Sequence, residues 1–130
     1  MALSPAYVRI ASGLLAGLAA CAPVEAAPEI SYQGIETRML DETLVEFRLA
    51  LKGAADDAAV RDYAACAAAR YALIHDHAYV RPIRMTTARS FGTWRADAVY
   101  MISRERPAGG NPAAARITVD ACAAKGIPTV

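Results

Sequence analysis

The chain has 130 residues, with 14 Lys and Arg against 13 Asp and Glu, which gives a formal net charge of +1. This near-neutral balance argues against a general nucleic-acid-binding protein, because such proteins carry a strongly basic surface. The length suits one domain, and after the N-terminal segment no apolar run approaches the roughly 20 residues needed to span a bilayer.

The first 20 residues have the features of a secretory signal peptide. Arg9 is the only charged residue of this segment, and residues 10–20 form an uncharged stretch of small and apolar residues. The stretch closes on the run Leu18-Ala19-Ala20-Cys21. This run resembles the lipobox of bacterial lipoproteins, in which the cysteine is acylated and becomes the first residue of the mature protein.

The lipobox resemblance implies a palmitate-type lipid anchor on Cys21 and a place on the periplasmic side of the cell envelope. Several acyl chains anchor a protein stably, since each buried CH₂ contributes about 0.8 kcal/mol. Ala22 resembles the residue found in lipoproteins of the outer membrane, because the aspartate that retains lipoproteins at the inner membrane is absent. The alternative is an ordinary cleaved signal peptide and a soluble periplasmic protein, since small residues around positions 20–27 offer other cleavage sites.

Residues 21–29 follow as the lipidated cysteine and a short tether, because residues 22–29 contain two prolines and no periodicity. The folded domain is then residues 30–130. Residues 30–39 predict a first strand with a bulge at Gly34, where the apolar positions change parity. Residues 45–51 alternate apolar and charged side chains and predict a second strand, joined to the first in a hairpin.

A helix is predicted from Asp56 or Asp57, either of which can cap it, to about His75. Its many alanines would allow it to lie close to a sheet. Residues 78–87 predict a third strand in which Pro82 marks an edge or a bulge, and residues 94–102 predict a fourth strand.

A second helix is predicted from Asn111 and Pro112 to Gly126, after a loop at residues 107–110. The β-branched residues 117–119 leave open a short strand followed by a helix from Asp120. The predicted order is β-β-α-β-β-α, which indicates an α+β domain: a four-stranded antiparallel sheet with two helices on one face.

Two cysteines remain after Cys21, namely Cys66 and Cys122. The periplasm permits their oxidation, and a leftover pair in an exported chain favours a disulfide bond. The alternative is that both are buried free thiols that pack as small apolar side chains.

The run His75-Asp76-His77 contains both histidines of the chain. Two imidazoles and a carboxylate are the start of a zinc or copper site, but the sequence signals no third protein ligand, so no metal is expected. The alternative reading is a helix C-terminus, where histidine interacts favourably with the helix dipole.

Charge is divided unevenly along the chain. Residues 25–62 carry nine acidic and four basic side chains, whereas residues 78–116 carry seven arginines and two acidic side chains. Arginine suits phosphate and carboxylate groups, so Arg81, Arg84 and Arg95 are candidate ligand-binding residues. The alternative is that the two predicted hairpins lie side by side and pair their charges across strands.

The alanine-rich segment from Val60 to Leu73, followed by a predicted hairpin, and the run from Cys122 to Thr129 resemble small uncharacterised proteobacterial envelope lipoproteins. That resemblance implies no activity and no catalytic residues. No nucleophile stands beside a base, and no glycine-rich phosphate loop is present. The sequence therefore predicts a lipid-anchored, non-enzymatic module without a cofactor, bound to membrane lipid through Cys21 and to an envelope protein or an anionic envelope glycan. The competing hypothesis is a small metal-dependent enzyme centred on His75 and His77.

Overall fold

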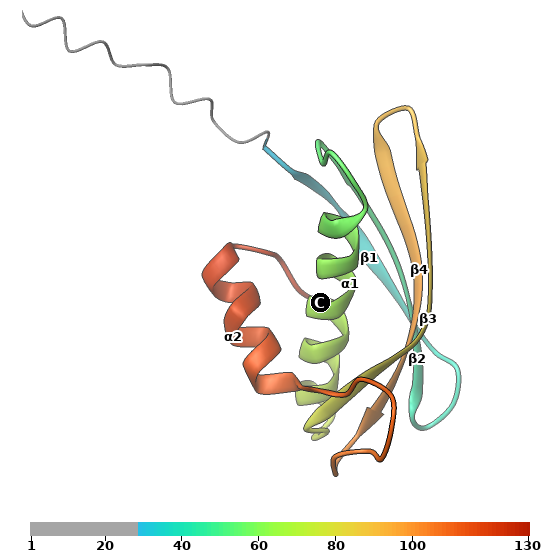
Figure 1. Cartoon of the computed structure of the whole chain (residues 1–130), viewed down its shortest axis with the longest axis vertical. Coiled ribbons are helices and arrows are strands. Elements are labelled where there is room, and N and C mark those ends of the chain that lie inside the picture. Colours follow the sequence, from blue (N-terminus) through green and yellow to red (C-terminus); the bar gives the residue numbers. More distant parts are fainter. Residues whose placement is uncertain (1–28) are drawn as a thin grey trace, which may run out of the picture.

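The computed structural model describes residues 29–130, so the predicted signal peptide, Cys21 and most of the predicted tether lie outside the described residues. The described strands are β1 (Ser31–Met39), β2 (Leu44–Lys52), β3 (Tyr79–Ser90), β4 (Thr93–Ser103) and β5 (Ala113–Ala114), and the helices are α1 (Ala58–Ile74) and α2 (Ala115–Lys125). They form an α+β domain (Figure 1). The strands lie in the order β1-β2-β4-β3-β5, and all neighbours are antiparallel.

The predicted α+β class, antiparallel sheet and two helices are confirmed, but the prediction of four strands and the order β-β-α-β-β-α was wrong. The sheet has a fifth strand, β5, which pairs with Tyr79 and Val80 at the start of β3. The order is therefore β-β-α-β-β-β-α. A strand of two alanines shows no alternating pattern, because alternation needs several residues to become visible.

The start of the last helix also differs from both predicted starts. α2 begins at Ala115, directly after β5, so it starts neither at Asn111 nor at Asp120, and residues 117–119 are helical. Its end agrees with the prediction, since Gly126 follows the last helical residue in the left-handed conformation with φ 68°. Glycine adopts this conformation without the steric penalty of a Cβ atom.

The domain has three layers: the sheet, α1 and α2. α1 packs against β2, β3 and β4, whereas α2 packs mainly against α1 and touches the sheet at β5 (Figure 1). Alternate residues of β2 and β4 face α1 and meet its alanines, which allow the helix to lie close to the sheet. The fully buried residues of this core include Val45, Phe47, Leu51, Val60, Ala64, Ala67, Ala68, Ala98 and Ile102. The two helices are thus on one side of the sheet, in successive layers.

The bulge predicted at Gly34 is present, and a second bulge lies next to Pro82, where the sequence left an edge or a bulge open. The register of β1 against β2 shifts between Tyr32 and Ile35, and Gly34 has φ 109° there. The register of β3 against β4 shifts between Pro82 and Arg84. The extra residue in β3 places Arg81 and Arg84 on the same face of the sheet, although an odd separation in a regular strand would place them on opposite faces.

The predicted disulfide bond between Cys66 and Cys122 is confirmed. It joins α1 to α2, and the two Cα atoms lie 5.9 Å apart. Only two residues of α2, Ala115 and Cys122, are buried, and Ile117 is 72% exposed. Since so little apolar surface of α2 is covered, the covalent bond is an important part of its attachment.

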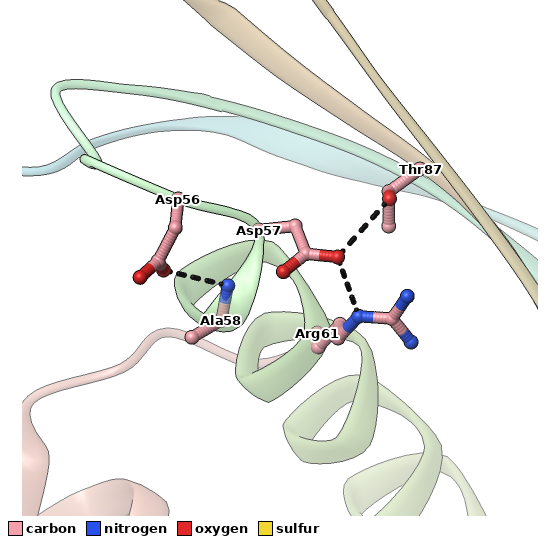
Figure 2. A network of polar contacts seen from close by, with 5 residues as sticks. All are labelled: Asp56, Asp57, Ala58, Arg61 and Thr87. Atoms are coloured by element: carbon pink, nitrogen blue, oxygen red, sulfur yellow. Dashed lines mark hydrogen bonds and ion pairs between the residues drawn. The ribbon is translucent and has the colours of Figure 1, made fainter.

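Two neighbouring aspartates organise the start of α1 (Figure 2). The carboxylate of Asp56 accepts a hydrogen bond from the amide of Ala58 at 3.0 Å. Asp57 occupies the N-cap position, but its carboxylate accepts hydrogen bonds from Arg61 Nε at 2.7 Å and from the Thr87 hydroxyl at 3.3 Å. The Arg61 guanidinium holds the pKa of Asp57 below its usual value. This network ties the helix to β3.

None of the helices in residues 29–130 has the length and apolar character needed to cross a bilayer.

Candidate functional site

The sheet face opposite α1 is covered by no other element of residues 29–130, and we call it the open face. Strand register assigns its charged side chains. They are Glu36, Arg38, Glu46, Arg48, Lys52, Arg81, Arg84, Arg95 and Asp97. Six basic and three acidic side chains give this face a formal charge of about +3, whereas the core face is apolar.

A groove of about 630 Å³ lies on this part of the sheet. The groove is hollow because small residues line it. Ala50 in β2 and Ala88 in β3 are the register partners of Arg95 in β4, and the Gly34 bulge lines the groove at β1. The Arg95 side chain is therefore exposed and has a methyl-bearing alanine on either side of it in the sheet. The sequence contains no motif that marks these small residues, since a groove depends on which strands become neighbours.

A row of polar residues crosses the sheet beside Arg95. Glu36, Arg48, Asp97 and Thr86 are register partners in β1, β2, β4 and β3, and all four line the groove. The site thus combines one free guanidinium with two carboxylates, a paired arginine and a hydroxyl. These groups can bind a small anionic ligand and orient its hydrogen-bonding substituents, but they contain no nucleophile paired with a general base.

Ion pairs distinguish the arginines of this face. In residues 29–130 the ion pairs are Arg38–Glu46 (3.7 Å), Arg48–Glu46 (3.4 Å), Arg48–Asp97 (3.9 Å) and Arg61–Asp57 (2.7 Å). Only the contact between Arg48 and Asp97 joins the two hairpins. The hairpins are neighbours, as the pairing alternative requires, but within this range none of the seven arginines of residues 78–116 forms an ion pair.

The three candidate arginines share the open face but not the same surroundings. Arg95 lines the groove, and Arg84 is exposed two rows farther along the sheet, opposite Val99. Arg81 is half-buried, and its Nη2 donates to the Met101 sulfur at 3.4 Å. Arg81 also lies beneath Gly110, where a Cβ atom would collide with its side chain. The structure therefore brings only Arg95 into the groove.

Two polar atoms of the open face are buried without a hydrogen-bond partner in the described part of the chain. They are Oδ1 of Asp97 and Nε of Arg81. A buried polar atom is costly unless it is paired. The Asp97 oxygen belongs to a residue of the groove, so a ligand with a hydrogen-bond donor could satisfy it.

The histidines lie elsewhere, at the C-terminus of α1. His75 is the C-cap residue, and its ring lies 4.2 Å from that of Tyr71 between centroids. Nδ1 of His77 is 2.7 Å from the carbonyl oxygen of His75, to which it donates when protonated. In residues 29–130, no group of three His, Cys, Asp or Glu side chains is placed to hold a metal ion.

Comparisons with known proteins give a family but no activity. The model of a family described as the YNQ4 C-terminal domain matches residues 32–126. A relative from Paracoccus denitrificans, "Uncharacterized 26.9 kDa protein in nqo8 5'region", is 30% identical over 110 residues, which cover 80% of this chain and 43% of the relative. The chain thus spans less than half the length of that relative. No solved structure matches the chain.

Proposed function

We propose that this chain, which belongs to the YNQ4 C-terminal domain family, is a lipid-anchored, non-enzymatic envelope module that binds an anionic envelope glycan on the open face of its sheet. In this proposal, acylation of Cys21 holds the domain on the periplasmic side of the outer membrane. The proposed binding site lies within residues 29–130, which the structure describes, whereas the proposed anchor rests on the sequence motif that ends at Cys21.

One observation carries the binding proposal: Arg95 stands in a groove with no ion-pair partner in residues 29–130. A guanidinium has five N–H donors in a planar fork, which matches the oxygens of a phosphate or carboxylate. The alanines on either side leave space for the ligand. Glycans also carry hydroxyl donors, for which the carboxylates of Glu36 and Asp97 are suitable acceptors.

The binding proposal is tested by comparing Arg95→Ala with Arg116→Ala in the full chain. Arg116 is an exposed arginine on α2, away from the open face. Arg116→Ala therefore removes the same charge as Arg95→Ala but leaves the groove intact. The two probes are lipopolysaccharide, which presents phosphates, and soluble peptidoglycan fragments, which present carboxylates. Loss of a charged hydrogen bond of about 1.5–3 kcal/mol weakens binding roughly 10- to 100-fold.

We expect one probe to bind the wild type and Arg116→Ala alike, to bind Arg95→Ala more weakly, and to be released by added salt. The bound probe identifies which anion is recognised. Equal affinity of Arg95→Ala and the wild type, or no binding of either probe at low salt, would contradict the proposal.

The anchor is tested separately with Cys21→Ser. This change should abolish incorporation of radiolabelled palmitate and leave an unprocessed precursor that migrates as a larger species. Cys66 and Cys122 form a disulfide bond and are therefore not competing acylation sites. Palmitate incorporation that persists in the variant would refute the assignment of Cys21.

A further inference from the structure

The β3–β4 hairpin ends in an unusual turn. Phe91 and Gly92 connect the paired residues Ser90 and Thr93, and both have positive φ, 51° and 77°. This is the pattern of a type I′ turn, whose first position favours asparagine, aspartate or glycine. Phenylalanine is costly there, because a bulky side chain clashes with the backbone in the left-handed region.

The Phe91 side chain also gains nothing from the rest of the domain. It is fully exposed, at 104% of its reference area, and it is the most exposed of the large apolar residues in the described part of the chain. A strained, fully exposed phenyl ring at the tip of a long hairpin suggests a contact outside the domain.

Strand register places this tip at the end of the sheet where the chain enters. Ser31, Lys52, Thr93 and Ser90 form one row across β1, β2, β4 and β3. Neighbouring strands are about 4.8 Å apart, so the turn between β4 and β3 is roughly 10–15 Å from the start of β1. Figure 1 shows the β3–β4 tip and the start of β1 toward the same end of the domain.

The length of chain before β1 links this end to the proposed anchor. Residues 22–29 separate Cys21 from the folded domain, and eight extended residues span at most about 28 Å. An acylated Cys21 would therefore keep the entry end of the sheet near the bilayer. This step rests on the proposed function.

The chemistry around the tip suits a bilayer interface. Lys52 and Arg89 stand in or next to the terminal row, and the Arg89 guanidinium lies 5.6 Å from the centre of the half-buried Trp94 ring. Basic and aromatic side chains are enriched where a protein meets phospholipid headgroups. Three acidic residues also lie near this end: Asp57 is paired with Arg61, whereas Glu29 and Asp56 are exposed.

We propose that Phe91 inserts into the headgroup region of the phospholipid bilayer and gives the domain a second membrane contact beside its acyl anchor. Two contacts at one end orient the sheet on the membrane. The groove at Arg95 then lies close to the bilayer, because Arg95 is two residues along β4 from Thr93.

The test uses one fluorescent reporter at the tip. The chain has a single tryptophan, so Trp94→Phe provides a dark background into which Phe91→Trp introduces an indole. The control is Ile117→Trp in the same background, because Ile117 is 72% exposed on α2 and follows β5 at the opposite end of β3. Circular dichroism verifies that both variants fold. The acylated chain is reconstituted in vesicles of phosphatidylethanolamine and phosphatidylglycerol with brominated acyl chains.

We expect the indole from Phe91→Trp to emit at shorter wavelength on vesicles, to be quenched by bromine and to be protected from aqueous iodide. The control indole should show none of these changes. If the two indoles respond alike and iodide quenches both, the membrane contact is refuted and a protein partner becomes the better explanation. If the cell does not acylate Cys21, its thiol is coupled to a maleimide phospholipid and the same fluorescence signals are measured. An anchor that fails in the cell leaves these signals intact, whereas a Phe91 contact that does not exist abolishes them.

Discussion

Removal of the disulfide bond should weaken the domain strongly. The variant is the full chain with Cys66→Ala and Cys122→Ala, which removes both sulfur atoms and leaves small apolar side chains in their place. α2 buries only Ala115 and Cys122, so little apolar contact remains to hold this helix on α1.

The magnitude follows from the loop that the bond closes. The two cysteines are 56 residues apart in sequence. The chain-entropy model assigns roughly 4 kcal/mol to a loop of this size. A small domain has a free energy of unfolding of about 5–15 kcal/mol, so this is a large share. At about 4–8 °C per kcal/mol, the melting temperature should fall by roughly 15–30 °C.

Urea unfolding and thermal melting of the oxidised wild type, the reduced wild type and the double variant measure this effect. The reduced wild type should behave like the variant, because both lack the bond. Hydrogen exchange adds a local readout: amides of α2 should lose protection before those of β2 and β4, which lie in the centre of the sheet.

Two results would refute this reasoning. The first is a double variant whose unfolding free energy lies within about 1 kcal/mol of the oxidised wild type, below the usual 2–4 kcal/mol range for a disulfide. The second is a thiol titration of the unfolded, unreduced protein that detects Cys66 and Cys122 as free thiols.

Two further predictions concern a buried tyrosine and a crowded glycine. Burial raises the pKa of Tyr100 to about 12, against about 10 in an unfolded chain. The folded chain then keeps a proton that the unfolded chain loses, so the contribution of Tyr100 to the unfolding free energy should be constant below about pH 10 and should fall by roughly 2–3 kcal/mol toward pH 12. Tyr100→Phe should remove this part of the slope in urea titrations, and an unchanged slope would contradict the assignment. Gly53→Ala should cost more stability than Gly92→Ala. Both glycines have positive φ, so either alanine should cost about 1–2 kcal/mol in backbone strain. Only at Gly53 would the new Cβ also meet a backbone oxygen, that of Glu29 at 2.5 Å. Equal losses in thermal melts would show that the contact relaxes without cost.

Local patterns predicted most of the fold. The parity change at Gly34 predicted a bulge, the alternation in residues 45–51 predicted β2, and Pro82 marked the irregularity of β3. Each signal depends on a few adjacent residues, so it is readable without knowing the neighbours. The disulfide bond was predictable as well, because the predicted export to an oxidising compartment and the predicted acylation of Cys21 left two cysteines to pair.

Long-range pairing explains what the sequence did not reveal. β5 exists because Ala113 and Ala114 meet the start of β3, and nothing in two alanines indicates a strand. The β-branched residues 117–119 are helical although their propensity favours a strand, and the bond from Cys122 to α1 holds their helix in place.

The candidate site was only partly predictable for the same reason. Arg95 was identified from the charge pattern, but the groove around it depends on Ala50 and Ala88, which come from separate strands. Arg81 and Arg84 share a face only because of the bulge between them. Phe91 falls between the predicted strands 78–87 and 94–102, but its exposure and backbone conformation required the structure.

The irregular edge at β3 has a consequence for how copies of this domain behave when concentrated. Beyond β4, and within residues 29–130, β3 pairs only with the two residues of β5, so most of its outer backbone is available to another strand. Such an edge invites growth of one sheet into the next and, eventually, fibrils. Pro82 lacks an amide hydrogen, the bulge breaks the pairing register, and Arg84 and Arg89 repel the same residues of a second copy. These three features disfavour pairing of two copies of the domain through β3.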